Sequence, residues 1–379
     1  MLLKKINTSL VLMAMLFVSS GVLAQNIDIK GRIVDAETNN PVEFANIGVV
    51  GTYLGTASDF DGYYQLSIGE EFANFKVQIS AVGYKVKEFT VDELNVLNGE
   101  SIKLFSQTYG IQAVDVKADS KRLYGIVKTA ANIIEDSYEN AYSANVYLEQ
   151  VMNGEKTEAV IRYSDEKGYG NRSLASVYES RGFEVKEVRR DYEVSPIKKG
   201  MIHANDLLAF DIVRQRGNVL DIAFVNDYEL TLAEESVVNG DSVWVINYKL
   251  NTPNVANTGD AYCKSYAGVI VIRQNDYSIV TNELEYTSKG FFHAGRDAYR
   301  SNTDGDDYTC KVTVNYRKTA NNKYALSKIR YEGEGDGTSL KASWVVYDYA
   351  TFKSGTDKTF YTDKAENKDF WSRFSLPSE

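Results

Sequence analysis

Residues 228–250 read YELTLAEESVVNGDSVWVINYKL, with two apolar-rich runs on either side of Asn239-Gly240-Asp241. An Asn-Gly step favours the positive φ angles of a tight turn between two antiparallel strands. The flanking runs are rich in β-branched and aromatic residues, which suit a pleated and half-buried surface. This stretch predicts a β-hairpin with strands over Tyr228–Val238 and Ser242–Leu250.

The same pattern recurs through the second half of the chain. Asn153-Gly154 separates two further expected strands, and Asn275-Asp276 marks another turn. Such runs between turn signals are typical of hairpins. The expected strands besides the first hairpin lie over residues 142–152, 155–164, 268–274, 277–287, 308–317, 323–331 and 340–349. We therefore expect a helix plus an antiparallel β-meander domain over residues 120–379, wrapped as a larger curved sheet.

A helix is expected at the start of this half, with Ser120 as its N-cap. Its apolar residues recur at helical spacing and form one stripe, made of Leu123, Ile126, Val127, Ala130, Ile133, Ile134 and Tyr138. A stripe of this kind usually packs on the protein's own sheet, although it could also serve as a partner-binding face. A second helix is expected near residues 204–216, with Asn205 as its N-cap.

Between residues 27 and 105 the chain alternates short strands with turn signals. Residues 27–34 and 75–80 alternate apolar and polar side chains, which indicates half-buried strands. Asp61-Gly62 predicts a tight hairpin turn. Seven short strands in this length predict an antiparallel β-sandwich.

This region resembles the carboxypeptidase-regulatory-like domain. The resemblance is carried by Ile29–Asp35, Pro41–Ile47, Gly55–Tyr64 and the Gly83-Tyr84 step. It implies a seven-stranded transthyretin-like β-sandwich that serves as an accessory module of envelope proteins and outer-membrane receptors, without peptidase chemistry. Residues 107–119 resemble the linker strand that follows this module.

The second half resembles a LolA-like half-barrel of Gram-negative envelope proteins. Asn239–Ile246 and Tyr266–Ile272 carry this resemblance, which is one of pattern and not of any ligand-binding signature. It implies a sheet whose concave face can hold an apolar ligand.

The first residues predict export from the cytoplasm. Lys4 and Lys5 precede an apolar run over 10–18, and small residues lead to Ala24. This order is that of a secretory signal peptide, and the apolar run is shorter than the roughly 20 residues that span a bilayer. The expected organisation is therefore a signal peptide at 1–24, a β-sandwich at 25–106, a linker strand at 107–119 and the meander domain at 120–379. No transmembrane segment is expected in the mature chain, which we place in the periplasm or at the periphery of the outer membrane.

Composition limits the partners and the chemistry. The net charge of -10 argues against a nucleic-acid partner, because no basic surface would gather phosphates. Cys263 and Cys310 are the two cysteines, and export permits a disulfide between them, although two unpaired buried thiols remain an alternative. Two cysteines and two histidines are too few for a structural zinc cluster.

Candidate metal sites are weak in this sequence. His203 and Asp206, with the distant His293, imitate the ligand spacing of a zinc carboxypeptidase, but aspartate replaces the expected glutamate. Asn205 and Asp206 are better interpreted as helix-start residues. The oxygen-rich runs over 302–307 and 332–337 could attract calcium, but they lack the spacing of an EF-hand loop and are interpreted as solvated or flexible loops.

The sequence contains no nucleophile elbow, phosphate-binding loop or dinucleotide fingerprint. We therefore expect no catalytic, cofactor-binding or metal residues, and a non-enzymatic envelope binding or scaffolding protein whose partner is an envelope protein, glycan or lipid. Two alternatives stay open: a hydrolase of envelope peptides or glycans, and a periplasmic carrier of lipids or lipoproteins.

Overall fold

The computed structural model describes residues 26–42, 45–52, 54–59, 61–81, 84–105, 116–170, 180–190, 204–238, 241–289, 307–335, 337–353 and 365–374. The chain divides into two compact units, Met1–Gln107 with Pro377–Glu379 and Thr108–Leu376. The expected signal peptide over 1–24 lies outside the described residues. Within the described ranges, no helix has the length and apolar character needed to cross a bilayer.

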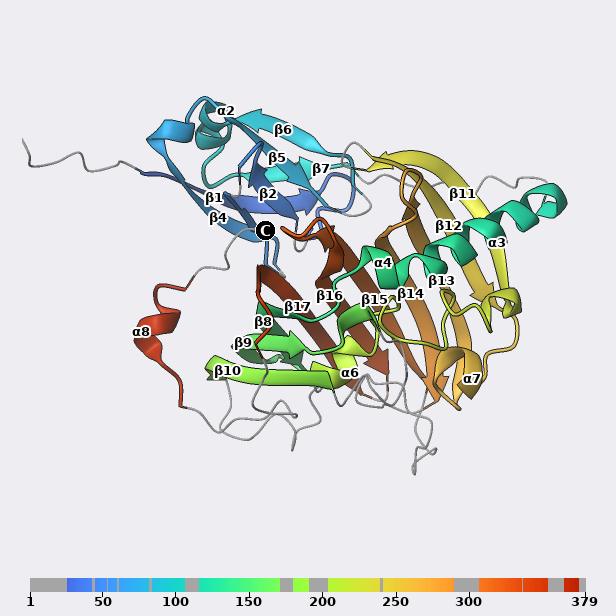
Figure 1. Cartoon of the computed structure of the whole chain (residues 1–379). Coiled ribbons are helices and arrows are strands. Elements are labelled where there is room, and N and C mark those ends of the chain that lie inside the picture. Colours follow the sequence, from blue (N-terminus) through green and yellow to red (C-terminus); the bar gives the residue numbers. More distant parts are fainter. Residues whose placement is uncertain are drawn as a thin grey trace, which may run out of the picture. The chain divides into compact units, whose positions relative to one another are not determined.

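The described part of the first unit forms seven strands in two sheets, as predicted. The strands are β1 (Asn26–Asp35), β2 (Asn46–Val49), β3 (Gly55–Ala57), β4 (Tyr63–Gly69), β5 (Lys76–Ser80), β6 (Lys87–Thr90) and β7 (Ser101–Leu104). One sheet has the order β4-β1-β7 and the other has the order β3-β2-β5-β6 (Figure 1). Alternate residues of β4, namely Tyr64, Leu66 and Ile68, point into the core that the two sheets enclose.

Three details of this unit differ from the prediction. Strand β7 pairs with β1 in parallel, so the sandwich is not wholly antiparallel. The Asp61-Gly62 turn connects β3 and β4, which lie in different sheets, and therefore closes no hairpin; Gly62 does have a positive φ of 81°. A short helix, α2 (Val91–Val96), precedes β7, and the side chain of Thr90 caps it by accepting from the Glu93 N–H.

The second unit is a mainly β structure with short helices and 3-10 turns. Its strands are β8 (Tyr142–Met152), β9 (Glu155–Asp165), β10 (Arg181–Arg190), β11 (Tyr228–Val238), β12 (Asp241–Leu250), β13 (Cys263–Arg273), β14 (Ile279–Lys289), β15 (Asp307–Lys318), β16 (Tyr324–Gly335) and β17 (Thr338–Ala350). Its helical elements are α3 (Val116–Asn132), α4 (Ile134–Ser137), η2 (Gly168–Gly170), α6 (Ala204–Leu208), η4 (Val225–Asp227), α7 (Val255–Thr258) and α8 (Lys368–Trp371).

These strands form one large antiparallel sheet that is not closed. Its order is β10-β9-β8-β17-β16-β15-β14-β13-β12-β11. Strands that pair are consecutive in sequence, except that β8 pairs with β17, and β10 and β11 are the two edges of the sheet. Among the described strands the register shifts at six positions, including one in the β10·β9 pair and one in the β11·β12 pair. Such bulges bend strands and increase their twist, which curves the sheet.

Helices α3 and α4 lie across the concave face of this sheet (Figure 1). The predicted apolar stripe faces it: Leu123, Val127 and Ile134 are buried in the same core as the inward side chains of the strands. The helix begins at Val116, so Ser120 lies within it and does not cap it. Of the predicted linker strand, residues 107–115 lie outside the described ranges, and the remainder belongs to α3.

Three other expectations for this unit are corrected. Strand β10 was not predicted. The helix expected over 204–216 ends at Leu208, and Asn205 lies inside it. Beyond this point, side chains such as Asp211 accept hydrogen bonds from turn N–H groups and replace the helical bonds. The expected loop over 332–337 is instead the end of β16 and a tight turn in which Gly337 has a φ of 69°.

Candidate functional site

The concave face of the ten-stranded sheet is where a half-barrel would hold a ligand. In the described part of the chain, this face is covered by α3, by α4 and by the segment 204–225, which we call the covering segment. Leu207, Phe210, Val213 and Leu220 of the covering segment are each no more than 3% exposed and belong to the same core as the inward strand residues. The concave face is therefore filled by side chains of the chain itself.

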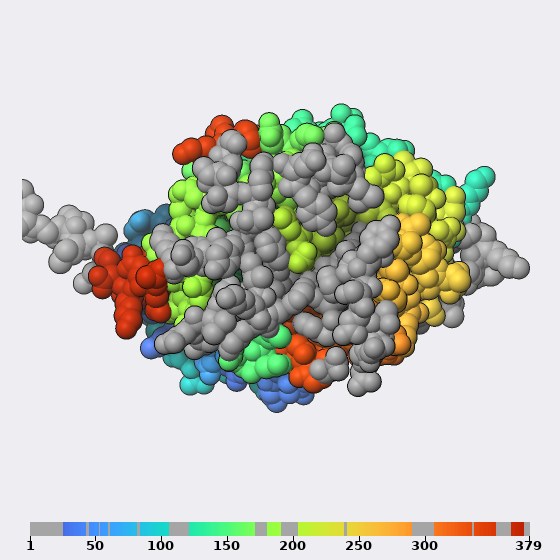
Figure 2. Space-filling model, turned by 90° about the horizontal axis from the view of Figure 1, so that it is seen from below, coloured from blue at the N-terminus to red at the C-terminus, as the bar shows by residue number. Residues whose placement is uncertain are grey.

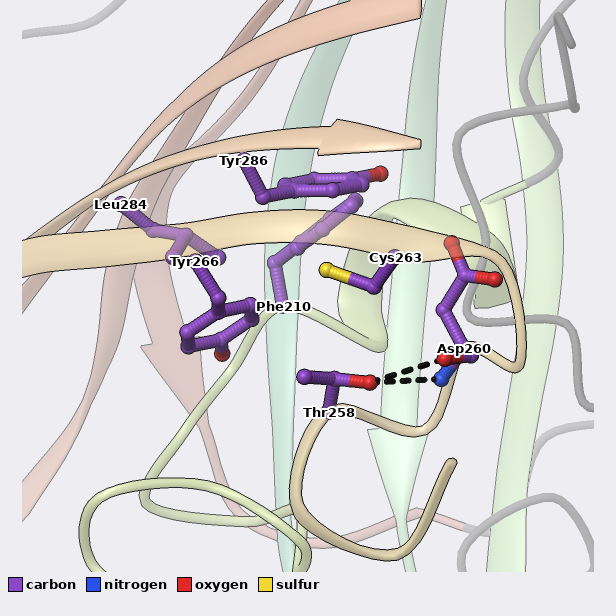
Figure 3. A pocket seen from close by; sticks show the side chains of 7 residues that line it. All are labelled: Phe210, Thr258, Asp260, Cys263, Tyr266, Leu284 and Tyr286. Carbon is purple, nitrogen blue, oxygen red and sulfur yellow. Dashed lines mark hydrogen bonds between the residues drawn. The ribbon is translucent and has the colours of Figure 1, made fainter. Parts of the chain in front are cut away.

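A small pocket remains at the rim of this core, where β13 begins (Figure 3). Its volume is about 10 Å³. Pockets that hold drug-sized ligands measure roughly 300–1,000 Å³. The residues that line it are Phe210, Thr258, Asp260, Cys263, Tyr266, Leu284 and Tyr286. In this conformation the pocket is too small for an acyl chain or a sugar ring.

The aromatic wall of the pocket follows from strand register. Tyr266 on β13 and Tyr286 on β14 are direct cross-strand partners, and their ring centroids lie 6.4 Å apart. The Phe210 ring of the covering segment lies 6.0 Å from Tyr286. Gly268 makes room for the neighbouring Tyr248: a Cβ there would lie 2.4 Å from the Tyr248 hydroxyl oxygen and 2.1 Å from the Glu283 carbonyl oxygen. The aromatic side chains therefore pack as core, with one edge at the pocket.

Polar groups at this pocket already have partners. The Thr258 hydroxyl donates to the Asp260 carbonyl at 3.0 Å and accepts from the Asp260 N–H (Figure 3). The Asp260 carboxylate accepts from the Tyr262 N–H at 2.8 Å and from the Ser288 hydroxyl at 2.5 Å. These bonds hold the turn before β13, and Asp260 functions here as a structural acceptor.

Cys263 and Cys310 are not joined by a disulfide in this structure. Cys263 is opposite Ser288 on β14, whereas Cys310 is opposite Tyr286 on the other side of the same strand. They are thus separated by two strand spacings, about 9.5 Å, which exceeds the roughly 7 Å Cα separation that a disulfide can bridge. The bridge considered from the sequence is not formed, because β14 lies between its two ends. The buried Cys310 thiol instead lies 2.9 Å from the Tyr331 hydroxyl.

A buried carboxylate holds the covering segment to the sheet. Asp211 is 2% exposed. It accepts from the hydroxyls of Tyr316 at 2.7 Å and Tyr169 at 2.9 Å, and from the N–H groups of Val213 and Arg214, both at 3.2 Å. Burial raises the pKa of the Asp211 carboxyl, and the hydrogen bonds from the two tyrosines oppose that shift. All four donors are fixed in place, which is the arrangement of a structural anchor.

A second buried carboxylate completes this network. Asp165 at the end of β9 accepts from the Ser180 hydroxyl at 2.7 Å and from Arg214 Nε at 3.1 Å. Arg181 is also fully buried; its Nη2 donates to the Leu208 carbonyl at 3.4 Å, while its Nε and Nη1 have no hydrogen-bond partner. The side chains of Asp165, Asp211, Arg181 and Arg214 are all buried, so two acidic and two basic groups lie in this core.

The structure describes only some of the candidate metal-binding residues and aromatic residues that the sequence suggested. His203 and His293 lie outside the described residues, and Asp206 lies in the first turn of α6. Of the run over 302–307, only Asp307 is described; it begins β15 and forms an ion pair with Lys264. Within the described ranges, no group of three histidine, cysteine or acidic side chains is arranged to hold a metal ion. Trp244, Trp344 and Trp371 are all buried and not part of an aromatic surface.

Sequence reasoning missed the buried network of Asp165, Arg181, Asp211 and Arg214. A signal was present, because Asp211 interrupts an otherwise apolar run from Leu207 to Val213 and Arg214 directly follows it. Charged residues at positions where the pattern expects apolar core residues indicate that these charges are buried and paired with one another. Their partners on β9 and β15 are remote in sequence and could not be chosen from it.

Comparison with known proteins supports the first resemblance. A family model described as CarboxypepD_reg-like domain matches residues 29–116. The TonB-dependent receptor SusC of Bacteroides thetaiotaomicron is 35% identical over 109 residues, which is 28% of this chain and 10% of the receptor. The chain therefore spans about a tenth of that relative. The N-terminal unit is a CarboxypepD_reg-like domain, as predicted.

Similar solved structures include two that match the expected LolA-like resemblance. A putative outer membrane lipoprotein-sorting protein domain from Vibrio parahaemolyticus is 11% identical, with 64% of this chain and 94% of that chain covered and a TM-score of 0.30. A LolA superfamily protein from Nitrosomonas europaea is 11% identical, with 65% and 97% covered and a TM-score of 0.26. At these TM-scores, neither similarity carries an argument about a ligand of this chain.

Proposed function

We propose that this protein is a non-enzymatic binding or scaffolding protein of the cell envelope. In this proposal the CarboxypepD_reg-like domain contacts the envelope partner. The ten-stranded sheet, whose concave face is occupied by the covering segment, is a scaffold. The observation that carries the proposal is the packing of the covering segment into the concave face, where Leu207, Phe210 and Val213 are buried in the core of the sheet. The buried carboxylates of this face accept hydrogen bonds from fixed donors. They therefore support packing better than they would support a reaction.

Two observations support an envelope partner. The chain is 35% identical over 109 residues to a TonB-dependent receptor, and its first residues predict export. The first unit also carries most of the exposed large apolar side chains in the described residues: Val50, Tyr63, Phe75, Val86, Val96 and Phe105, against Ile222, Val237 and Val255 in the second. We place the protein in the periplasm or at the periphery of the outer membrane, with an envelope protein as partner.

Photo-crosslinking in intact cells tests this assignment. A photoreactive phenylalanine analogue replaces Tyr63, which is 56% exposed on the first unit, and in a matched control it replaces Ile222, which is 49% exposed on the second. The proposal expects a discrete adduct with an envelope protein from position 63 and none from position 222. Adducts from position 222 alone would contradict the role given to the first unit.

The lipid-carrier alternative makes the opposite prediction about the second unit. A carrier must hold its lipid in an apolar space, whereas side chains of the covering segment occupy the described concave face. Native mass spectrometry of the mature protein, purified from membranes in mild detergent, should give the mass of the polypeptide alone. A stoichiometric phospholipid or lipoprotein adduct would favour the carrier instead.

A further inference from the structure

The convex face of the sheet carries a short aromatic segment at the C-terminal end of the described chain. We call residues 365–374, which include α8, the strap. Trp371 and Phe374 of the strap pack with Tyr147 of β8 and Val160 of β9, and the Trp371 indole N–H donates to the Val188 carbonyl at 3.2 Å. In Figure 2 the red C-terminal residues lie beside the green region of the chain that contains β9 and β10.

Two carboxylates face each other beneath this cover. Glu149 of β8 and Glu158 of β9 are direct cross-strand partners, and their side chains are only 5% and 7% exposed. Like charges directly opposite one another on neighbouring strands are destabilising. Lys156 offsets part of this repulsion, with its ammonium nitrogen 2.7 Å from Glu149 Oε2 and 3.6 Å from Glu158 Oε1.

One hydroxyl joins the two carboxylates. The Tyr147 oxygen lies 2.7 Å from Glu149 Oε2 and 2.7 Å from Glu158 Oε1. A phenol has a single proton and can donate to only one acceptor. The other contact therefore needs a proton from a carboxyl group, so the geometry fits a pair in which one glutamate is protonated.

Two side chains touch both the carboxyl pair and the strap. The Tyr147 ring stacks on Phe374 with centroids 5.8 Å apart, while its hydroxyl holds the carboxyl groups. Arg189 donates from Nε to Glu158 at 2.7 Å, and its guanidinium lies 4.8 Å from the centroid of Trp371. Removing the strap would uncover both of these side chains and admit water to the carboxyl pair.

The remaining charged or titratable groups around the pair come from each element that packs there. They are Lys156 of β9, Glu187 and Arg189 of β10, Lys341 and Tyr347 of β17, and Lys368, Asp369 and Arg373 of the strap. Lys156 and Arg189 together match the charge of two ionised glutamates. The strap contributes one acidic and two basic groups.

We propose that the strap is a proton-linked latch, docked on the convex face when Glu149 carries a proton and released when Glu149 is ionised. Burial raises the pKa of Glu149, with Lys156 opposing, so the docked state holds its proton more tightly than the open state does. Docking therefore takes up a proton and is favoured as the pH falls. As the pH rises through the raised pKa, the docked state loses this stabilisation.

Hydrogen exchange of the strap amides in the full mature chain tests the proposal. With rates corrected for intrinsic exchange, the opening constant of the strap should rise by up to about tenfold per pH unit between the ordinary value of 4.5 and the raised pKa, as expected for release of one proton, and should level off above the raised pKa. Glu149→Gln, which mimics the protonated carboxyl, should abolish that slope. Glu229→Gln, an exposed carboxylate on β11, is the matched control and should retain it. A slope of zero in the wild type, or a full slope in Glu149→Gln, would overturn the proposal.

A second measurement does not depend on how Glu149→Gln folds. Carboxyl carbon NMR of chains labelled at glutamate gives the titration midpoint of Glu149 directly. We expect a midpoint above the ordinary value of 4.5 in the wild type and a return toward it in Trp371→Ala, where the strap loses its anchor. The same midpoint in both chains would show that the strap and the carboxyl pair are not linked.

Discussion

The two faces of the ten-stranded sheet both bury carboxylates, and they stabilise them differently. On the concave face, Asp211 accepts hydrogen bonds from two tyrosine hydroxyls and two backbone N–H groups. On the convex face, Glu149 and Glu158 compete for one tyrosine proton. The first arrangement fixes one packing of the covering segment on the sheet. In the second arrangement a proton can bind or dissociate as the pH changes, so one sheet combines a rigid concave face with a titratable convex face.

The largest effect should come from removing the concave anchor. Asp211→Ala removes the carboxylate acceptor of two buried tyrosine hydroxyls and one of the acceptors of the Val213 and Arg214 N–H groups, and should lower the free energy of unfolding of the second unit by about 3–5 kcal/mol. Tyr316→Phe, which removes one donor and keeps the ring, should cost only about 1–2 kcal/mol. Urea unfolding followed by tryptophan fluorescence measures this, because all three tryptophans lie in the second unit. Equal losses in both variants would argue against Asp211 as the hub.

Packing of the concave aromatic wall should give the next largest effect. Gly268→Ala places a Cβ within 2.4 Å of the Tyr248 hydroxyl oxygen, and should cost about 2 kcal/mol because the Glu283 backbone on the other side cannot move away. Gly125→Ala is the matched control: it lies in α3 with nothing within 4 Å of the new Cβ, and should stabilise the chain by about 0.5–1 kcal/mol. Thermal unfolding distinguishes the two. A neutral Gly268→Ala would mean that the wall is loosely packed.

The convex pair should appear as a slope of stability against pH. The folded chain raises the pKa of Glu149 above its ordinary value of 4.5, so it binds this proton more tightly than the unfolded chain. Its contribution is present at a pH below the raised pKa and is lost as the pH rises through it. Urea unfolding at a series of pH values should therefore show a component that decreases with pH in the wild type. This component should be missing in Glu149→Gln and unchanged in Asp260→Asn.

The smallest effect should come from an exposed ion pair. Arg122 of α3 and Glu235 of β11 approach to 2.7 Å with side chains 50% and 47% exposed. Solvent screening limits such pairs to about 0.5 kcal/mol, so Arg122→Ala should be close to neutral in urea unfolding. A loss as large as that of Gly268→Ala would show that α3 is held on the sheet by charge, and not by its apolar stripe.

Local sequence features predicted most strands of the ten-stranded sheet. The turn signals at Asn153-Gly154 and Asn275-Asp276 located strands β8, β9, β13 and β14, because turn chemistry and alternation are local properties. Strand β10 was not predicted because Arg181, Glu184 and Lys186 obscure the alternation of apolar and polar residues along it. The inward Arg181 is stabilised only by its tertiary environment. The expected helix over 204–216 failed for the same reason, since Asp211 bonds to residues of η2 and β15.

The candidate site was less predictable than the fold. Filling of the concave face depends on where the covering segment lies, and its anchors join residues as far apart as Asp211 and Tyr316. The cross-strand pairing of Glu149 and Glu158 follows from the Asn153-Gly154 hairpin and could have been derived from its register. Their burial could not, because the strap that covers them comes from the far end of the chain.

Hydrogen exchange across the covering segment tests the filled concave face most directly. If residues 204–225 are part of the core, their buried amides should be protected to nearly the same degree as those of β14 and β15, and should exchange only when the second unit unfolds. Exchange of this segment within seconds, while the strands stay protected, would mean that it opens independently and that the concave face is a site with a removable plug.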